Sequence, residues 1–562
     1  MQDSNPSRRR GVVAAAVAAA SLLAVGLVAC GGGGGPKRDP NVPASARVLV
    51  LFHLRGDEAS LAARARATSD PDGPRYRAFP KVAQLAARWG APTDAVDHVV
   101  GKLRDAGATA TVDRSRTVVQ AQMTADQVAD VLGVGLRLAK GADGGQALVP
   151  DRELRVPSSM RDEVVGVVGA RGTLAAGPAP DLGGQVAEPP CRPGEGTVGG
   201  PTAVGERYGY DDYLFRDDVR GQGRRIAVLA IGRYEPAALE RFASCYGTRP
   251  SGRIRVLRTP LAPKVQVGPE VTLDTIVASS FAPEAAIDVV QYDGGGSPAA
   301  ALVRVVDGPR YDAVSTSIGY CEADLSDAER ALVDHLALVL SATGTPVLAS
   351  SGDTGAAACH PASDRAAVQY PASSPWVLGV GGTTLRSRGG DLEEAVWNTS
   401  TPTSPQAGGG GPSHVVARPW YQRGLTVPGV AGASKRVVPD VALLADPTLV
   451  PAIPLCRTAG DCDWVRLAGT SAPAPALAAA LALVSQDVAA RAGDDGQLGL
   501  LQPLVRALAT SGSPAVNDVT EGDNRVLGLP CCAAGPGYDG ASGWGSLRAD
   551  ALADAVVAAR PR

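Results

Sequence analysis

Runs of apolar residues alternate with amphipathic stretches and divide the chain into a small front region and a large rear region. In the front region the pattern predicts a strand, three helices, two strands, a helix and a final strand. These elements are expected at 48–54, 58–67, 82–89, 93–106, 108–112, 117–122 and 125–132, with the last strand near Leu136. Strands mixed with helices in this way predict a small α/β sandwich of roughly a hundred residues, a normal size for one domain.

The rear region carries short, continuous apolar runs separated by helical stretches. The first run, 225–232, ends in a glycine, which is typical of a strand buried on both faces. Similar runs occur at 287–290, 313–317, 345–350 and 376–380, and helices are expected at 270–280 and 325–342. This alternation predicts a doubly wound parallel sheet, in which ligands lie at the carboxyl ends of the strands.

Between the two regions, residues 171–205 are rich in glycine and proline and follow neither period. We therefore expect a linker here. In a precursor protein, exposed and unpaired backbone of this kind is where a protease cleaves.

The N-terminus has the layout of an export signal, with three arginines before an apolar run from Gly11 to Val28. That run is marginal for a membrane-spanning helix. Its end, Leu27-Val28-Ala29-Cys30, resembles the bacterial lipobox, in which the cysteine is lipidated and becomes the first mature residue. A plain secretory signal with an unrelated cysteine is the alternative. We expect a signal over 1–30, a glycine-rich tether over 31–45, and an envelope lipoprotein or an extracellular protein after release.

Composition narrows the class of protein. With 562 residues, 45% apolar and 20% charged, the chain is long enough for two or three domains and too apolar to be disordered. A net charge of -3 provides no basic surface for nucleic acid. We expect a monomer without a nucleic-acid partner.

Cysteine usage agrees with export, because eight cysteines remain when Cys30 is set aside, and an even number outside the cytosol indicates disulfides. The short spacing of Cys456 and Cys462 suits a local bridge, and Cys321 with Cys359 is our second expected pair. No CxxC pair and no histidine-rich cluster indicates a zinc site.

The turn Gly469-Thr470-Ser471 precedes an apolar run to Val484 that predicts a buried helix, and Pro475 fits the first turn of such a helix. A hydroxyl here lies at the positive end of the helix dipole, near unpaired backbone N–H groups. This location suits a nucleophile whose product is an oxyanion. The alternative is a serine that caps an ordinary core helix.

A serine nucleophile needs a base, and the rear region has three histidines, His335, His360 and His414. His335 falls inside an expected helix and the other two fall in expected loops. The His-Gly-Thr segment that accompanies a subtilisin-like serine turn does not occur in the chain. Histidine is therefore not the base that we expect.

Glu270 and Asp274 offer another base. Two carboxyl groups at i and i+4 share one helix face and can share a proton. A solvated acidic helix start is the alternative. However, the apolar run that follows predicts a buried helix, and unpaired buried acids are costly, so a functional role explains this pair better.

A third acid, Asp353, lies in Ser350-Ser351-Gly352-Asp353-Thr354-Gly355, directly after an expected buried strand. By itself it could be the N-cap of the next helix.

Together these segments resemble the sedolisin family, the kumamolisin-like serine-carboxyl peptidases. The family places its serine in Gly-Thr-Ser-x-x-x-Pro, its acid pair in Glu-x-x-Leu-Asp and its oxyanion aspartate in Ser-Gly-Asp-Ser/Thr-Gly, as Ser471, Glu270, Asp274 and Asp353 stand here. Further matches are Tyr370-Pro371, Gly381-Gly382-Thr383, Trp397-Asn398 and Val438-Pro439-Asp440-Val441. Residues 46–170 resemble the family's activation propeptide, although a free-standing binding domain is the alternative.

The resemblance implies a subtilisin-like peptidase domain over 206–562 and a role for each acid. Ser471 would attack the peptide carbonyl, Glu270 would take its proton, and Asp274 would orient Glu270. Asp353 would have to be protonated to donate to the oxyanion. We therefore expect a self-processing zymogen that acts on proteins or peptides at acidic pH, with the propeptide as its inhibitor and chaperone.

A calcium site is expected near the C-terminus, where two aspartates stand among turn-forming residues. Carboxylates and bent-loop carbonyls are the ligands that Ca²⁺ prefers. The resemblance implies the side chains of Asp518 and Asp539 and the carbonyls of Val519, Gly535 and Gly537. A Gly-Pro-Gly turn beside two unrelated aspartates is the alternative.

Two departures concern specificity. Ile318 stands where relatives usually have tryptophan or tyrosine, and Thr275-Ile276 replace a common Ile-Glu after the second acid. Two classes of function remain. The first is a peptidase, either an endopeptidase or a tripeptidyl-peptidase, and the second is a catalytically silent surface protein that binds through the peptidase fold. The presence of all four catalytic side chains favours the enzyme.

Overall fold

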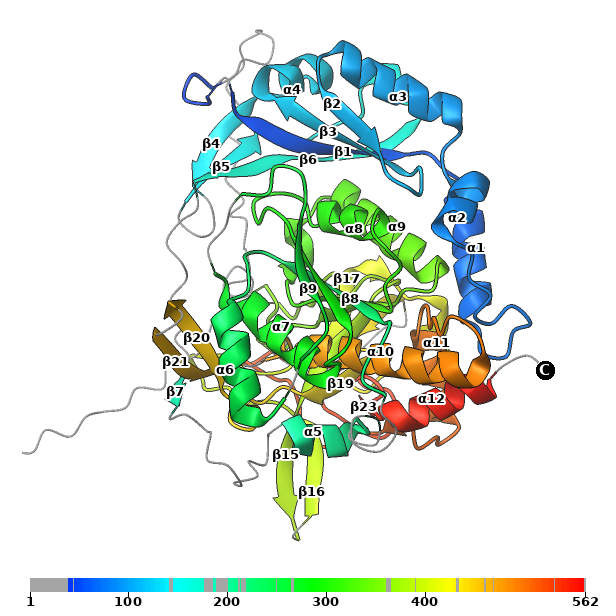
Figure 1. The fold of residues 1–562 in the computed structure, drawn as a ribbon, viewed down its shortest axis with the longest axis vertical. Helices are drawn as coiled ribbons and strands as arrows, with labels where there is room; N and C mark the ends of the chain where they lie inside the picture. The colour runs from blue at the N-terminus through cyan, green and yellow to red at the C-terminus, as the bar shows by residue number, and fades with distance from the viewer. Residues whose placement is uncertain are drawn as a thin grey trace, which may run out of the picture.

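The computed structural model describes residues 39–559 except positions 44, 141–144, 176–184, 188–200, 211–212, 214–218, 249, 264–266, 360–364, 390, 431–433, 459–460, 468 and 530. The expected export signal, the first part of the tether and His360 lie outside these residues. Figure 1 shows an upper body of sheet and helices, in blue and cyan, above a larger lower body.

The upper body is a six-stranded antiparallel sheet with strand order β2-β3-β1-β6-β5-β4. Its elements are β1 (Arg47–Leu54), α1 (Glu58–Ser69), α2 (Val82–Trp89), α3 (Thr93–Asp105), β2 (Thr109–Val112), β3 (Val118–Thr124), α4 (Ala125–Leu132), β4 (Leu136–Lys140), β5 (Gln146–Pro150) and β6 (Val164–Ala175). The elements from β1 to β4 follow the predicted order. The sequence pattern did not predict β5 and β6.

The lower body is an eight-stranded sheet of order β16-β15-β13-β11-β8-β10-β9, with β19 beside β15. Its neighbouring strands are parallel except for β15 and β16. The strands are β8 (Arg225–Ala230), β9 (Ile254–Arg258), β10 (Ala286–Gln291), β11 (Ala313–Thr316), β13 (Val347–Ser350), β15 (Leu378–Arg388), β16 (Asp391–Val396) and β19 (Val441–Leu444). The expected parallel sheet is therefore present.

Helices cover both faces of the parallel sheet. They are α6 (Pro236–Tyr246), α7 (Pro269–Phe281), α8 (Ala299–Val306), α9 (Asp327–Ala342), α10 (Pro473–Ala492), α11 (Gln502–Thr510) and α12 (Ala549–Ala558). Helices α7 and α10 share one hydrophobic core, and α8 and α9 share the other. Among the described residues, α10 alone is long and apolar enough to cross a membrane, and its burial in the first core explains that composition.

Shorter strand pairs lie outside the two large sheets. They are β12 (Tyr320–Cys321) with β14 (Gln369–Tyr370), β17 (Gly411–Ala417) with β18 (Lys435–Val438), β20 (Ile453–Thr458) with β21 (Asp461–Arg466) and β7 (Gln185–Ala187), and β22 (Val516–Asn517) with β23 (Ser546–Leu547).

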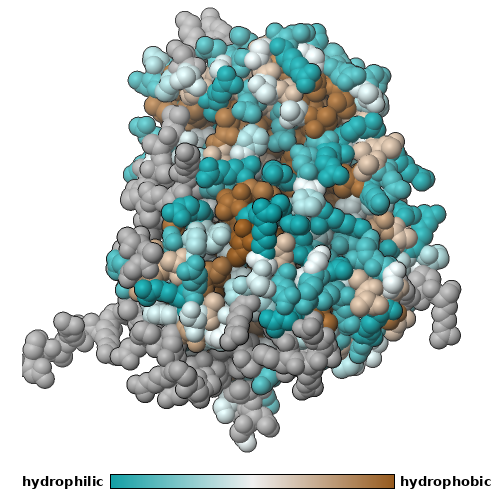
Figure 2. Space-filling model, in the orientation of Figure 1, coloured by the Kyte–Doolittle hydropathy of each residue, from teal (hydrophilic) through white to brown (hydrophobic). Residues whose placement is uncertain are grey.

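Strand β1 shows how the two bodies meet. Val50 and Phe52 point to the face covered by α3 and α4, whereas Leu51 points to the face that packs on α8 and α9. This alternation follows from the two-residue period of a strand. The upper sheet is thus sandwiched between its own helices and two helices of the lower body (Figure 1). In Figure 2 hydrophilic residues cover most of the visible face, and apolar residues come to the surface in patches on the upper body and on the upper part of the lower body.

Some segments differ from the sequence predictions. Val42, expected in the tether, is only 1% exposed and packs in the core of the upper body. Within the expected linker, β6 continues to Ala175, β7 pairs with β21, and helix α5 (Pro201–Tyr208) begins before the linker ends. A three-residue strand such as β7 is too short to show the alternation of apolar and polar positions that predicts a strand.

Three disulfides are found among the described residues. Two of them, Cys321–Cys359 and Cys456–Cys462, are the expected pairs. In the third, Cys531 pairs with its neighbour Cys532.

Arg436, which is 0% exposed, ties together the chain around the start of β15. Its guanidinium donates to Asp440 Oδ2 at 2.7 Å and to the carbonyl oxygens of Ala372 and Val377 at 3.1 Å each. Asp440 in turn accepts from the Gly379 N–H at 2.8 Å. Each of the two charges therefore offsets the cost of removing the other from water.

Replacing Arg436 with alanine should lower the free energy of unfolding by about 3–5 kcal/mol, because it leaves Asp440 buried without its counter-charge. Urea unfolding of the purified protein measures this loss. The control is Arg491→Ala, which removes a partly exposed pair with Asp487 and Asp554 and should cost less than about 1 kcal/mol. Equal losses in the two variants would contradict the assignment.

Candidate active site

The four predicted catalytic side chains come from three places that meet at the carboxyl ends of the parallel strands. Glu270 and Asp274 stand in the first turns of α7, Asp353 follows β13, and Ser471 stands two residues before α10. The carboxyl ends of neighbouring parallel strands lie at one edge of a sheet, which is where ligands bind in this class of fold. The structure brings all four side chains to this edge.

Ser471 is 2% exposed. It does not cap α10, because the cap residue is Ala472 and no side chain makes a capping hydrogen bond. The alternative interpretation, in which Ser471 is the N-cap of an ordinary core helix, is therefore excluded. Its hydroxyl interacts instead with the carboxyl group of Glu270.

Asp274 is buried and Glu270 is partly buried, and removal from water raises the pKa of both carboxyl groups. For Glu270 burial is the largest cause and the charge of Asp353 adds to it, while hydrogen bonds from the Ser471 and Ser317 side chains act in the other direction. Burial and the charge of Glu270 raise the pKa of Asp274 well above its usual value. Two carboxyl groups so close favour one shared charge, with one neutral acid beside one base.

Glu270 has an unused acceptor. Its Oε1 is buried and has no hydrogen-bond partner in the protein. Because buried polar atoms are nearly always paired, an unpaired carboxyl oxygen beside a serine hydroxyl needs an explanation. Acceptance of a proton during a reaction is such an explanation.

Ser317, the residue directly after β11, links the acid pair to the serine turn. Its Oγ donates to Asp274 Oδ1 at 2.7 Å and lies 3.3 Å from the Ser471 carbonyl oxygen. The sequence motifs gave Ser317 no role. Its position at the carboxyl end of a buried strand was the one available signal.

Asp353 is held against the serine turn by Thr470, whose N–H and hydroxyl donate to Asp353 Oδ1 at 2.7 and 2.9 Å. Burial raises the pKa of Asp353, and the two bonds from Thr470 act against that shift. Gly469 completes this contact. Its φ is +107°, and a Cβ at this position would lie 2.3 Å from Asp353 Oδ2, so both backbone and space require glycine.

The described histidines of the lower body lie elsewhere. His335 contacts His53 and Glu58 of the upper body, and the ring of His414 bonds the carbonyl oxygen of Ala366 at 2.6 Å. The acids are therefore the titratable groups that stand beside Ser471 in the described part of the chain.

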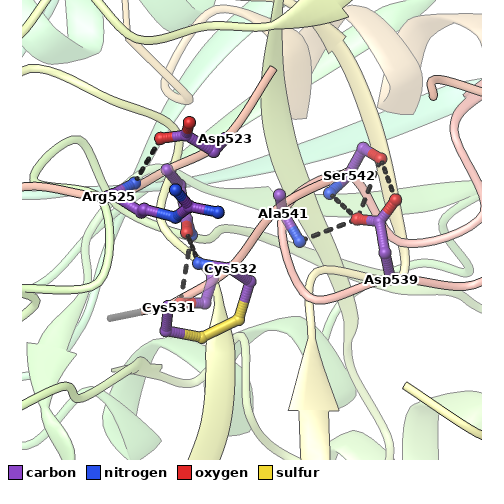
Figure 3. Close-up of a disulfide and its surroundings, with 9 residues drawn as sticks. Asp523, Arg525, Cys531, Cys532, Asp539, Ala541 and Ser542 are labelled. Atoms are coloured by element: carbon purple, nitrogen blue, oxygen red, sulfur yellow. Dashed lines mark hydrogen bonds between the residues drawn. A yellow bond between two sulfur atoms is a disulfide. The ribbon is translucent and has the colours of Figure 1, made fainter. Parts of the chain in front are cut away.

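The expected cation ligands also lie together. Asp539 is 0% exposed and accepts from the Gly535 N–H at 3.0 Å, while Asp518 accepts from the Gly537 N–H at 2.7 Å. Ser542 joins them, because its hydroxyl lies 3.2 Å from both Asp539 Oδ2 and the Val519 carbonyl oxygen. Figure 3 shows Asp539 turned toward Ser542 and Ala541, near the Cys531–Cys532 disulfide.

This donor set fits a hard divalent cation, since it offers carboxylate and carbonyl oxygens and neither nitrogen nor sulfur. Burial raises the pKa of Asp539, and backbone N–H groups are its main compensation. A bound cation would compensate the buried carboxylate more fully.

Comparison with known proteins gives the same family for the front and the rear of the chain. The family model "Pro-kumamolisin, activation domain" matches residues 37–172. Kumamolisin of Bacillus sp. (strain MN-32) is 30% identical over 526 residues, which are 89% of this chain and 89% of kumamolisin. The chain belongs to the sedolisin family of serine-carboxyl peptidases.

Other sedolisins agree with this placement. Sedolisin of Pseudomonas sp. (strain 101) is 26% identical over 527 residues, covering 90% of this chain and 86% of its own length. Human tripeptidyl-peptidase 1 is 32% identical over 259 residues, 42% of each chain. In fold, a Pseudomonas sedolisin complexed with two molecules of pseudo-iodotyrostatin gives a TM-score of 0.55 at 24% identity, over 65% of this chain and 99% of that chain.

The protein is thus a sedolisin-type serine peptidase made with an activation domain. The lower body is a doubly wound parallel sheet of the kind found in the family, and the upper body is its activation domain. An activation domain of this kind implies an inhibitor carried within the same chain.

Glu270→Gln, made in a Ser471→Ala chain to prevent self-digestion, should change how stability depends on pH. Burial raises the pKa of Glu270, so folding favours its protonated form. The stability from this group is complete below the pKa of an exposed glutamate, about 4.3, and is lost as pH rises through the raised folded pKa. Glutamine has no charge to bury. The variant should therefore be more stable than its parent by on the order of 1 kcal/mol at about pH 7, and little changed at about pH 4.

Urea unfolding at the two pH values measures this difference. Glu240→Gln, on the exposed side of α6, is the matched control and should leave the difference near zero at both. A gain that is the same at both pH values would show that Glu270 is not buried at a cost in its charged form.

Proposed function

We propose that this sedolisin hydrolyses peptide bonds through an acyl-enzyme on Ser471, as an endopeptidase or a tripeptidyl-peptidase. The Ser471 Oγ attacks the carbonyl carbon of the peptide bond while Glu270 takes the hydroxyl proton. Collapse of the tetrahedral intermediate breaks the C–N bond, and Glu270 returns the proton to the leaving amine. Water then attacks the ester in the same way and frees Ser471.

Asp274 and Ser317 position the base in this proposal. A neutral Asp274 beside Glu270 allows Glu270 to carry the single charge that the pair can hold. Ser317, bonded to Asp274 and close to the Ser471 carbonyl oxygen, keeps the acid pair aligned with the nucleophile.

Asp353 stabilises the oxyanion in this proposal, and only its protonated form can donate a hydrogen bond. The raised pKa of Asp353 keeps it protonated to a higher pH than an exposed aspartate. Activity should therefore fall on the alkaline side when Asp353 ionises, and on the acid side when the Glu270 and Asp274 pair gains its second proton. These two limbs confine activity to the pH range between them, and kinship to the serine-carboxyl peptidases supports an acidic optimum.

One observation carries the proposal more than any other: the unpaired, buried Oε1 of Glu270 in a group that interacts with the Ser471 hydroxyl. The base and the nucleophile are then neighbours, and no histidine of the described chain stands beside them. Kinship to peptidases supports the chemistry and the Gly469 contact supports the position of Asp353.

We further propose that the chain is exported, anchored through a lipid on Cys30 or released, and processed by its own active site between the activation domain and the peptidase domain. The layout of residues 1–30 and the Gly/Pro-rich stretch within 171–205 support this. The substrates are proteins or peptides outside the cytosol.

Purified precursor held at about pH 4 should convert itself to a peptidase domain without its activation domain, as we propose for a serine-carboxyl peptidase that acts at acidic pH. Mass spectrometry of the products follows the conversion. Ser471→Ala should stay intact, and Asp353→Ala should lose about 100- to 1,000-fold in kcat after processing in trans.

A pH profile of kcat/KM completes this test and should show an acidic optimum. An optimum at or above neutrality would contradict the roles of Glu270 and Asp353. Retained activity in Glu270→Ala, with loss in His335→Ala or His414→Ala, would contradict the choice of base.

We also propose that one structural calcium ion binds Asp518, Asp539 and the carbonyl oxygens of Val519, Gly535 and Gly537. Calcium would supply the counter-charge for the buried Asp539 and take no part in the chemistry.

Removal of calcium with EGTA should lower the melting temperature by several degrees, since a ligand at about 100 times its Kd adds about 2.7 kcal/mol of stability. Calcium added back, but not magnesium, should restore it. Asp539→Asn should start at the lower temperature and respond to neither treatment. An unchanged melting temperature after chelation would exclude the site.

A further inference from the structure

Three side chains from both bodies of the protein converge on the junction between them. His53 lies on β1, Glu58 is the first residue of α1, and His335 lies in the middle of α9. The rings of His53 and His335 are 4.5 Å apart between centroids, and Glu58 Oε2 lies 3.4 Å from His335 Nδ1. One ligating atom from each residue lies within 4.8 Å of the other two.

The strand period brings His53 to this place. It has the same parity as Leu51, whose side chain faces α8 and α9, and it pairs in the sheet with Val118 of β3 and Gly166 of β6. The Gly166 Cα carries no side chain between β6 and α9, and a Cβ there would lie 3.7 Å from the Ala328 Cβ and 3.9 Å from the His53 Cβ. The imidazole is therefore enclosed at the junction, 4% exposed.

His335 has no hydrogen-bond partner at either ring nitrogen, although its side chain is only 3% exposed. Loss of hydration without a replacement partner costs free energy, and most buried polar groups avoid it. The 3.4 Å approach of Glu58 does not supply a hydrogen bond to Nδ1. A buried ring with no partner at either nitrogen indicates a ligand, bound through one of them, that the protein groups alone do not provide.

The donor set is one that zinc accepts. Two imidazole nitrogens and one carboxylate oxygen are a known three-ligand set for Zn²⁺, with water at the fourth position. Bond lengths of about 2.0–2.2 Å in a tetrahedron place neighbouring ligand atoms about 3.3–3.6 Å apart. The Glu58 to His335 separation of 3.4 Å meets this value, and all three ligand atoms lie within 4.8 Å of one another, so they would draw together when the ion binds. Glu58, with 56% of its side chain exposed, leaves a route for the ion and the water.

We propose that His53, Glu58 and His335 bind one Zn²⁺ ion that ties the activation domain to the peptidase domain. His53 and Glu58 fall within the family match at 37–172, whereas His335 belongs to the peptidase domain. The ion bridges the two domains and holds the activation domain in place. This site is separate from the peptidase chemistry and from the calcium ligands, and it does not depend on either.

The cluster has no signature in the sequence. Zinc motifs are recognised by ligands a few residues apart, and here the third ligand lies hundreds of positions after the first two. The expectation of no zinc site rested on short spacings, which cannot reveal ligands assembled by the packing of two domains.

Metal titration of the full-length Ser471→Ala precursor tests the proposal. The protein is stripped with a chelator, confirmed intact by mass, and saturated with Ca²⁺ so that the Asp539 region cannot take up the probe. Co²⁺ is then added and its visible absorption is followed. We expect one equivalent of Co²⁺ with the intense absorption of a site with few ligands, displaced by one equivalent of Zn²⁺.

Glu58→Gln and His335→Gln should each weaken Co²⁺ binding by more than about 100-fold, because changes that only reorient a metal ligand already cost about 10- to 100-fold. Glu58 is largely exposed, so its variant folds even where a buried histidine variant does not. The control is His98→Gln. His98 forms another histidine–glutamate pair in the activation domain, 2.7 Å from Glu163 Oε1, and its loss should leave Co²⁺ binding unchanged.

A melting temperature measured with and without Zn²⁺ provides a readout independent of colour. Zn²⁺ should raise it in the precursor and in His98→Gln, but not in Glu58→Gln. The proposal is overturned if the precursor takes up no stoichiometric metal, or if Glu58→Gln binds Co²⁺ as tightly as its parent.

Discussion

Three carboxyl groups, one buried and two partly buried, lie at one edge of the parallel sheet, and no lysine or arginine pairs with them in the described chain. Glu270, Asp274 and Asp353 cannot all be charged there, because each buried charge raises the cost of the next. The surrounding elements place these acids and partly compensate their charge. Helix α7 places two acids on one face, β13 delivers the third, and hydroxyl and backbone donors from Ser317 and Thr470 supply what compensation there is.

The activation domain and the peptidase domain share a layer of structure. Helices α8 and α9 cover one face of the parallel sheet and also pack beneath the sheet of the activation domain. A second contact lies at the far end of α1 and α2, where Arg77 bonds Asp494 Oδ1 at 3.0 Å and the Gln497 carbonyl oxygen at 2.9 Å. The activation domain is therefore held at several separated points, which include bonds from Arg114 to Asp307 and from Thr173 to Asp293, and none of these uses the catalytic side chains.

The sequence predicted elements with a strong helical period, such as α2 and α4, and the central parallel strands, which appear as continuous apolar runs. It also placed Ser471, Glu270, Asp274 and Asp353 in motifs, whose convergence the structure then displays. The sequence did not reveal the roles of Ser317 and of the cluster of His53, Glu58 and His335, because these roles depend on contacts between residues far apart in the chain. β5 and β6 were not predicted because β5 has only five residues and β6 is interrupted by glycines, so neither shows a clear strand pattern.

Strand β7 lies within the stretch where we propose that cleavage occurs. Its residues 185–187 add a third strand to the β20–β21 hairpin, which also carries the Cys456–Cys462 bridge. Cleavage on the N-terminal side of β7 would leave the mature enzyme beginning with a strand that is already paired with β21. Cleavage on the C-terminal side of β7 would instead remove this strand with the activation domain and expose the edge of β21. An exposed strand edge can pair with an extended peptide.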